Sequence, residues 1–271
     1  MRDISYAGKR IVLTGGFSGI GAALIEVLRE LGADNIVVLD LKEPATTVER
    51  FITTDMGNPV SIDTAATAIG EGVDVLFNNA GIAATHPAER VMRVNLLGLK
   101  RLTERLLPGM RTGGAIINTA STAGNQWPGN LDIIRNLLAV QGWDEGVAWI
   151  HDHMPAVADG YFFSKQCVQV YTMLLSRPAI RQGIRVNSIC PSPVDTPLLP
   201  EFRATMTDKI IDWAIAEGAG RVATPRDQAK ALAFLGSDLA SYVNGVNLLV
   251  DGGFTAAMTT GQVDMSALAG S

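Results

Sequence analysis

Cysteine, aromatic residues and charge are all scarce in this chain of 271 residues. It has two cysteines, Cys167 and Cys190, which excludes a disulfide framework and indicates a reducing compartment. Charged residues make up 18%, and the formal net charge of -5 argues against a nucleic-acid partner. There is no apolar run of the roughly 18 residues that a membrane span requires, and residues 1–9 lack the apolar core of a signal peptide. We therefore expect a soluble, cytoplasmic protein with no membrane partner.

Apolar residues make up 47% of the chain and form short runs that alternate with amphipathic segments. The runs are apolar throughout, as strands are in a parallel sheet that helices cover on both faces. Strands are expected at residues 10–14, 35–40, 51–54, 73–78, 115–119, 185–190 and 246–250, and helices at 19–31, 59–69, 88–107, 161–176 and 226–235. The pattern predicts an α/β fold, a single Rossmann-like, doubly wound domain over residues 1–271 with about seven parallel strands.

Two segments interrupt the alternation of strands and helices. Residues 122–160 are far longer than a usual connection and have a helical pattern of their own. We interpret them as a helical insertion before the helix that begins at residue 161. Residues 192–225 begin with several prolines and contain a helical stretch around residues 206–216. We predict that they form a mobile substrate lid over the carboxyl edge of the sheet.

A glycine-rich turn follows the first predicted strand and leads directly into the first predicted helix. Small residues allow a tight turn and close approach to a pyrophosphate, which the N-terminal amides of a helix attract. A tight turn without a ligand is the alternative, but the strand–turn–helix context favours a dinucleotide site. The contacts expected from this turn are Gly15, Phe17, Ser18, Gly19, Ile20 and Gly21.

The acidic residue that ends the second predicted strand indicates which dinucleotide binds. Asp40 stands 19 residues after Gly21, where a carboxylate accepts hydrogen bonds from the ribose hydroxyls and repels a 2′-phosphate. Lys42 argues for NADP, but the turn supplies no arginine. We therefore expect NAD(H), with Asp40 and Leu41 among its contacts; a solvated aspartate at a strand end is the alternative.

A tyrosine and a lysine four residues apart begin the helix predicted at residues 161–176. This spacing places the phenol of Tyr161 and the ammonium of Lys165 on one face of the helix. Because a neighbouring cation lowers the pKa of a tyrosine, we expect Tyr161 to exchange a proton with an alcohol or carbonyl oxygen near neutral pH. The pair is common by itself, but together with the glycine-rich turn it is a strong indication.

Together, these motifs resemble those of the short-chain dehydrogenases/reductases over essentially the whole chain. The long insertion and residues 241–258 resemble, in particular, the bacterial 3α-hydroxysteroid dehydrogenase/carbonyl reductase subgroup. Seven motifs occur in the family's order: Thr14-Gly15…Gly19-Ile20-Gly21, Asn78-Asn79-Ala80-Gly81, Val94-Asn95, Ile117-Asn118-Thr119-Ala120-Ser121, Tyr161…Lys165, Cys190-Pro191-Ser192 and Val250-Asp251-Gly252-Gly253.

The resemblance implies roles for the matching residues. Tyr161 is the implied general acid/base, Lys165 holds the nicotinamide ribose, and Ser121 bonds the substrate oxygen. Asn95 is implied to hold a water that links Lys165 to solvent. The other implied cofactor contacts are Asp55, Met56, Asn79, Ala80, Gly81, Pro191, Val194 and Thr196. Ser192 departs from the family's glycine, and if that glycine has a positive φ, serine strains the loop by about 1 kcal/mol.

The implied activity is that of an NAD(H)-dependent oxidoreductase. It would interconvert a bulky apolar secondary alcohol and its ketone, either a hydroxysteroid or another cyclic or aryl ketone. The candidate pocket residues are Trp127, Leu198, Leu199, Phe202 and Met206. The alternative for each is that it packs the insertion against the lid. A catalytically weak, dinucleotide-sensing relative is the alternative function. The presence of all four catalytic candidates argues against it.

The insertion also bears on the oligomeric state, and it contains two histidines that could suggest a metal site. In this family the helix that carries the tyrosine usually forms part of a tetramer interface, which the inserted helices would cover. We therefore expect a homodimer through residues 226–235 and 246–250, with a homotetramer as the alternative. His151 and His153 are two residues apart with no third ligand close in sequence, so we expect no metal site.

Overall fold

The computed structural model describes residues 4–265 of the chain. Its framework is a seven-stranded parallel sheet in the order β3-β2-β1-β4-β5-β6-β7, so the chain winds outward in both directions from β1 and β4. The strands are β1 (Arg10–Thr14), β2 (Asn35–Asp40), β3 (Arg50–Thr53), β4 (Val73–Asn78), β5 (Met110–Thr119), β6 (Arg185–Pro191) and β7 (Asn247–Val250). The predicted doubly wound α/β domain with seven strands is confirmed.

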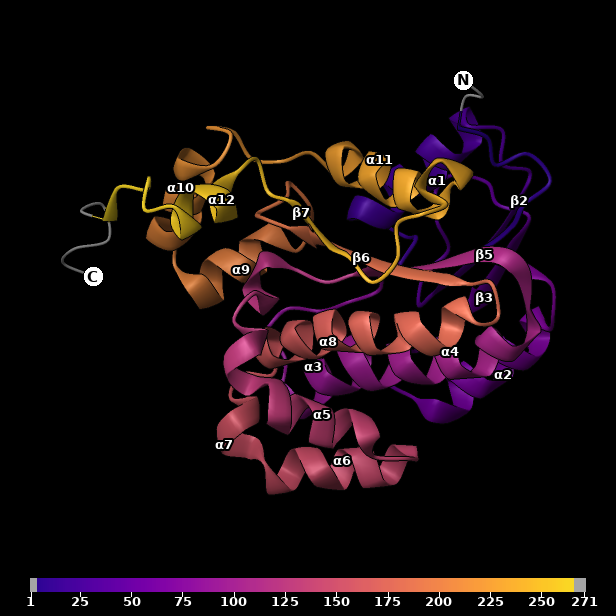
Figure 1. Ribbon diagram of the computed structural model, residues 1–271, viewed down its shortest axis with the longest axis horizontal. Helices are drawn as coiled ribbons and strands as arrows, with labels where there is room; N and C mark the ends of the chain where they lie inside the picture. Colours follow the sequence, from indigo (N-terminus) through magenta and orange to yellow (C-terminus); the bar gives the residue numbers. More distant parts are fainter. Residues whose placement is uncertain (1–3, 266–271) are drawn as a thin grey trace.

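Helices cover both faces of the sheet (Figure 1). One layer consists of α1 (Gly19–Glu30) and α11 (Pro225–Gly236), and the other of α2 (Pro59–Ile69), α4 (Leu99–Leu106) and α8 (Tyr161–Ile180). Successive side chains of β1 point to opposite faces, so Ile11 and Leu13 join the core beneath α1 and α11, whereas Val12 joins the core beneath α8. The central strands β1, β2 and β4 are buried on both faces, which explains why they are largely apolar.

The helix predicted at residues 88–107 is interrupted, so that prediction is partly wrong. The segment consists of α3 (Ala88–Met92), the π-helical η1 (Arg93–Gly98), α4 and the short 3₁₀ helix η2 (Leu107–Gly109). At Gly98 an added Cβ would lie 2.1 Å from the carbonyl oxygen of Met56, so the backbone approaches that residue very closely. A wider turn of this kind is frequent at functional sites, and this one contains Asn95.

The insertion is helical, as predicted. It comprises η3 (Thr122–Gly124), η4 (Trp127–Asn130), α5 (Leu131–Ala139), α6 (Trp143–Asp152) and α7 (Met154–Val157). Helix α5 packs along α8, and α6 packs against α3 and η1 (Figure 1). The ring of Trp149 stacks on His153 at 3.9 Å and lies parallel to Phe163 of α8 at 6.2 Å between ring centroids. These aromatic contacts fasten the insertion to the helix that begins with Tyr161.

Three short helices lie beyond the carboxyl ends of the strands (Figure 1). They are α9 (Leu199–Met206), α10 (Asp208–Glu217) and α12 (Phe254–Thr259). The sequence predicted one helical stretch in residues 192–225, whereas the structure has two, separated at Thr207, whose φ is 69°. Trp213 of α10 meets Phe254 of α12 edge to face at 5.2 Å, so residues far apart in sequence form one cover.

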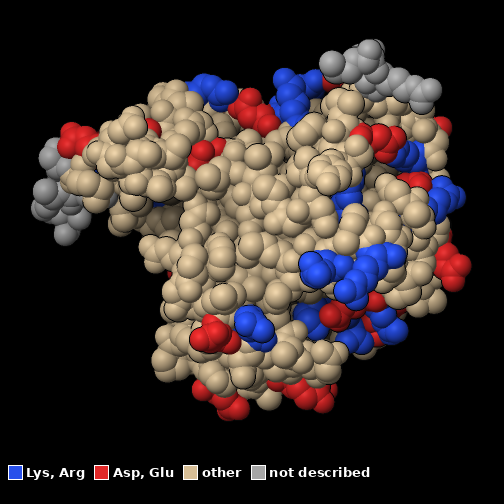
Figure 2. Space-filling view, in the orientation of Figure 1, with Lys and Arg blue, Asp and Glu red and all other residues tan. Residues whose placement is uncertain are grey.

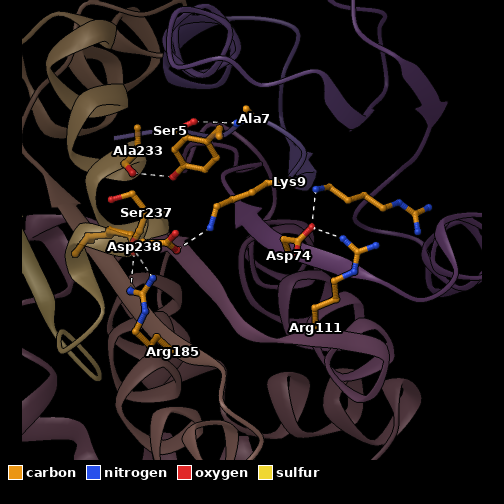
Figure 3. A network of polar contacts seen from close by, with 12 residues as sticks. Ser5, Ala7, Lys9, Asp74, Arg111, Arg185, Ala233, Ser237 and Asp238 are labelled. Atoms are coloured by element: carbon orange, nitrogen blue, oxygen red, sulfur yellow. Dashed lines mark hydrogen bonds and ion pairs between the residues drawn. The ribbon is translucent and has the colours of Figure 1, made fainter. Parts of the chain in front are cut away.

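Polar contacts tie together the opposite, amino-terminal edge of the sheet (Figure 3). Arg185, at the start of β6, donates to the carbonyl oxygens of Leu235 at 2.8 Å and Ser237 at 3.0 Å. Ser237 lies between α11 and the 3₁₀ helix η5 (Asp238–Ala240). The buried phenol of Tyr6 donates to the carbonyl of Ala233 at 2.7 Å. These bonds anchor α11 to this edge. None of the helices among residues 4–265 combines the length and apolarity needed to cross a membrane.

The bond made by Tyr6 has a measurable contribution to stability. Tyr6→Phe removes one hydroxyl from a fully buried position, so we expect the free energy of unfolding in urea to fall by about 1 kcal/mol. Tyr242→Phe is the matched control because the side chain of Tyr242 is fully exposed, and it should leave stability unchanged. Equal effects of the two substitutions would contradict this account of the edge.

Candidate active site

A cavity of about 1050 Å³ lies at the carboxyl edge of the sheet. Its walls come from the segments that follow the first six strands, β1 to β6, and from α9, α10 and α12. In an open parallel sheet, the crevice where the strand order reverses is the usual place for a dinucleotide. The cavity therefore lies where the topology predicts a ligand.

The turn between β1 and α1 brings two stretches of backbone unusually close together. Gly15 has a φ of +75°, and an added Cβ there would lie 2.7 Å from the Cα of Ala80. The amide of Asn79 donates to the carbonyl of Gly15 at 3.0 Å, which fastens the turn to the end of β4. Gly21 was predicted as a contact but lies outside the cavity lining, because it packs beneath the turn, where a Cβ would meet the Gly15 carbonyl oxygen at 1.9 Å.

The carboxylate of Asp40, at the end of β2, is hydrogen-bonded to this turn. It accepts hydrogen bonds from the backbone N–H groups of Phe17 at 2.9 Å and Leu41 at 2.6 Å. The ammonium of Lys42 lies 5.2 Å from the centroid of the Phe17 ring, beside the same turn. The other predicted cofactor residues that line the cavity are Ser18, Gly19, Ile20, Asp55, Met56, Asn79, Ala80, Gly81, Tyr161, Lys165, Pro191, Val194 and Thr196.

Helix α8 begins at the cavity because of the two residues before it. Gly160 has a φ of +81°, and an added Cβ would lie 2.6 Å from the carbonyl oxygen of Ala88, so no larger side chain fits. The carboxylate of Asp159 accepts a hydrogen bond from the backbone N–H of Tyr161 at 2.9 Å. These two residues place Tyr161 at the cavity wall, against α3.

Three of the predicted catalytic side chains meet at one end of the cavity. Tyr161 shares a side-chain hydrogen bond with Ser121, whose Oγ also accepts from the backbone N–H of Ala123 at 3.1 Å. The ammonium of Lys165 lies 5.8 Å from the centroid of the Tyr161 ring and donates to the carbonyl of Thr119 at 2.9 Å. The structure thus joins the end of β5 to the first turn of α8.

Burial favours the neutral form of both Tyr161 and Lys165 and shifts their pKa values accordingly. It raises the pKa of Tyr161 to about 12, which outweighs the lowering effect of the hydrogen bond with Ser121. Burial also lowers the pKa of Lys165 to about 8. The expected lowering of the tyrosine pKa is therefore wrong for the polypeptide alone, because desolvation of the phenolate dominates.

Asn95 lies behind the cavity wall rather than on it. Its side chain is 1% exposed, and its amide both accepts from the N–H of Ile82 at 2.9 Å and donates to the carbonyl of Ile82 at 3.0 Å. It also donates to Ser164 of α8 at 3.3 Å. The structure places Asn95 as a bridge between the loop after β4 and α8, and its part in proton transfer stays a prediction.

Helix α9 presents one face to the cavity. Leu198, just before the helix, Phe202 and Met206 recur at helical spacing and line it, and the ring of Phe202 lies 5.0 Å from that of Tyr161. Leu199 was predicted to line the cavity but lies about 100° around the helix from this face, and it is absent from the lining. Trp127 was also predicted to line the cavity, but it packs against the core beneath α8.

Residues of α10 and α12 line the cavity, although the sequence reasoning missed them. They are Ile210, Ile211, Trp213 and Ala214 of α10 and Phe254, Thr255 and Met258 of α12. Polar or charged lining residues from other elements include Arg90, Asn125 and Glu201. The helical spacing of apolar residues in 210–214 was the available signal. Ser192 also lines the cavity, and the predicted strain is absent because only Ala158 and Thr207 have a positive φ among the described non-glycine residues.

The two histidines of the insertion make other contacts. His151 pairs with Glu89 at 2.8 Å, and the Nδ1 atom of His153 lies 2.8 Å from the carbonyl oxygen of Trp149. Across residues 4–265, no cluster of three or more His, Cys, Asp or Glu side chains is arranged to hold a metal ion. Cys167 and Cys190 are both buried and unpaired.

Comparisons with known proteins agree with this architecture. A family model described as short chain dehydrogenase matches residues 9–131, and one described as Enoyl-(Acyl carrier protein) reductase matches residues 150–255. The coniferyl-alcohol dehydrogenase of Pseudomonas sp. (strain HR199 / DSM 7063) is 36% identical, with 93% of this chain and 99% of the relative covered. The cis-4-hydroxycyclohexanecarboxylate dehydrogenase of Sinomonas cyclohexanicum is 34% identical, with 93% and 98% covered.

The crystal structure of the 3α-hydroxysteroid dehydrogenase from Pseudomonas sp. B-0831, complexed with NADH, superposes with a TM-score of 0.79. It is 28% identical in sequence, and the match covers 94% of this chain and 100% of that one. The sequence matches extend over nearly the whole chain, and the glycine-rich turn, Ser121, Tyr161 and Lys165 all lie at one cavity. The chain therefore belongs to the short-chain dehydrogenase/reductase family.

Proposed function

We propose that the protein is an NAD(H)-dependent oxidoreductase that interconverts a bulky, apolar secondary alcohol and its ketone. The observation that carries this proposal is the meeting of Ser121, Tyr161 and Lys165 in the same cavity as the glycine-rich turn and Asp40. Relatives at 36% and 34% identity are both named as dehydrogenases of alcohols, which supports the reaction class.

The residues at the cavity fit a nicotinamide dinucleotide. Gly15 and Gly19 both have a positive φ, and a Cβ at Gly15 would collide with the backbone of Ala80, so glycine permits the tight turn that leads into α1. The N-terminal amides of α1 would hold the pyrophosphate. Asp40 would accept the hydroxyls of the adenosine ribose, and Lys165 would hold the nicotinamide ribose. When bound, NAD(H) supplies or accepts the hydride.

Tyr161 and Ser121 handle the substrate oxygen. In ketone reduction, Tyr161 donates its phenolic proton to the carbonyl oxygen, while the hydroxyl of Ser121 holds that oxygen by a hydrogen bond. A pKa of about 12 keeps the phenol of Tyr161 protonated at neutral pH, as this direction requires. In alcohol oxidation the phenolate takes the proton. The ammonium of Lys165, with a pKa of about 8, is charged at neutral pH and stabilises the phenolate.

The apolar lining supports a bulky, ring-bearing substrate. Beyond Tyr161, the cavity continues along Leu198, Phe202 and Met206 of the α9 segment and then along α10 and α12. The ring of Phe202, 5.0 Å from that of Tyr161, forms a flat apolar surface beside the reacting oxygen. The names of two relatives, a hydroxysteroid dehydrogenase and a hydroxycyclohexanecarboxylate dehydrogenase, both denote alcohols on a ring.

The role of Tyr161 is tested by removing its hydroxyl. Tyr161→Phe should lower kcat by about 10²–10⁴-fold, because the proton donor is lost, while NADH binding followed by fluorescence stays within about twofold. Tyr171→Phe is the matched control, since Tyr171 is buried in the same helix but lies outside the cavity lining. Turnover by Tyr161→Phe at the wild-type rate would refute the assignment.

The choice between NAD and NADP is tested at Asp40. Because its carboxylate would repel a 2′-phosphate, Asp40→Ser should lower the preference for NAD over NADP, measured as the ratio of kcat/KM values, by about tenfold or more. Lys42→Ala should leave the use of NAD unchanged. A wild-type enzyme that prefers NADP and loses this preference in Lys42→Ala would contradict the proposal.

We also propose a homodimer formed through α11 and the edge strand β7. Leu249 of β7 is 41% exposed and Tyr242 is fully exposed, and the surface around β7 carries few charged side chains in the view of Figure 2. Because α5 packs along α8, that helix is a less accessible interface.

Light scattering tests the dimer directly. The wild type should have twice the mass of the chain, and Leu249→Lys should have the mass of one chain, because it places a charge on the proposed contact. The control Leu174→Lys places the same charge at an exposed position of α8 and should remain dimeric. A tetramer that Leu174→Lys disrupts would contradict the proposal.

A further inference from the structure

A continuous series of hydrogen bonds connects α12 to the backbone of the catalytic serine. The hydroxyl of Thr255 in α12 accepts from the Nδ2 atom of Asn125 at 3.1 Å. The Oδ1 atom of Asn125 accepts from the Nε2 atom of Gln169 at 3.1 Å, and the same Nε2 atom donates to the carbonyl of Ser121 at 2.8 Å. Two side chains therefore connect the cover of the cavity to the residue that holds the substrate oxygen.

The α12 end of this series lies where a large substrate would reach. Thr255 and its neighbours Phe254 and Met258 all line the cavity. The helix follows Gly252 and Gly253, whose φ values are +65° and +90°, and the carboxylate of Asp251 accepts from the N–H of Thr255 at 2.8 Å. A short helix after two such glycines is held by few contacts, so the position of α12 depends on what packs against it.

The Ser121 end is packed too tightly to move independently of α8. Gln169 is 2% exposed, and a Cβ at Gly124 would lie 2.6 Å from the carbonyl oxygen of Lys165. The N–H of Gly124 also donates to the carbonyl of Ser121 at 3.0 Å. Gln169 and the loop at Gly124 therefore hold Ser121 against α8, and Ser121 in turn hydrogen-bonds Tyr161.

We propose that Asn125 and Gln169 are positioning residues that couple the seating of α12 to the placement of Ser121. The enzyme then discriminates substrates by size, because a substrate large enough to contact α12 also stabilises the catalytic geometry. This proposal rests on the proposed oxidoreductase function for its kinetic consequence. The coupling itself is a property of the polypeptide and can be measured without turnover.

The same loop contains a matched control pair. Asn130 donates to the Oε1 atom of Gln166 at 2.8 Å, so it too joins an asparagine after β5 to a glutamine of α8. Neither Asn130 nor Gln166 lines the cavity, and neither takes part in the hydrogen bonds that connect Thr255 to Ser121. Asn130→Ala thus removes a bond of the same chemistry from the same region without breaking the connection.

The kinetic test compares a polycyclic ketone, such as androstane-3,17-dione, with cyclohexanone. Thr255→Val and Asn125→Ala should lower the ratio of kcat/KM for the polycyclic ketone to that for cyclohexanone by about fivefold, the effect of one neutral hydrogen bond, because only the polycyclic ketone reaches α12. Thr255→Ser should restore the wild-type ratio, and Asn130→Ala should not change it. A uniform loss on both ketones, or the same loss in Asn130→Ala, would overturn the proposal.

The pH profile separates positioning from a general loss of structure. Because the hydrogen bond with Ser121 lowers the pKa of Tyr161, displacing Ser121 raises that pKa. The pH at which alcohol oxidation reaches half of its plateau should therefore move upward in Asn125→Ala and stay in place in Asn130→Ala. An unmoved midpoint in Asn125→Ala would overturn the proposal.

Hydrogen–deuterium exchange decides the coupling even if the wild type turns over no ketone, an outcome that would refute the proposed function alone. In Thr255→Val the amides of residues 122–125 should exchange about fivefold faster, together with those of 254–259. Exchange in 122–125 that stays at the wild-type rate, or that rises equally in Asn130→Ala, would overturn the coupling.

Discussion

The close approach of the turns after β1 and β4 is the constraint on which the site depends. Gly15 lies so close to Ala80 that no side chain fits between them, and Asn79 bonds both the carbonyl of Gly15 and the hydroxyl of Thr119. One asparagine thus fastens the ends of three adjacent strands. Since Lys165 donates to the carbonyl of Thr119, the same frame also positions the helix that carries Tyr161.

Burial shifts the pKa values of the two titratable side chains that this frame positions. Tyr161 and Lys165 are both buried at one end of the cavity, so their pKa values move in opposite directions, upward for the phenol and downward for the ammonium. The hydrogen bond between Ser121 and Tyr161 opposes the effect of burial, so the position of Ser121 influences the pKa of Tyr161.

The sequence predicted the parts of the structure that are encoded locally. The glycine-rich turn, the strand-end Asp40 and the i, i+4 pair of Tyr161 and Lys165 each depend on a few neighbouring residues, and all lie at the cavity. The parallel sheet was also predictable, because strands buried on both faces are apolar throughout.

Features that depend on tertiary packing could not be predicted in the same way. The π-helical turn at Asn95 arises where Gly98 packs against Met56, a contact that hydrophobic periodicity does not reveal. The apolar character of Trp127 and Leu199 suggests that they line the cavity. Whether they do so depends on how η4 and α9 are rotated, and neither side chain lines it. The raised pKa of Tyr161 also depends on tertiary packing, because it results from the burial of the start of α8.

The central claim is that this cavity transfers a hydride between NAD(H) and a ring-bearing alcohol or ketone. The most direct measurement follows the absorbance of NADH and, separately, of NADPH in the presence of the wild-type protein and steroid, monocyclic or aryl ketones. The account predicts consumption of NADH with at least one ring ketone and slower consumption of NADPH. If the protein binds NADH but consumes none of it with every ketone tested, that result would contradict the account.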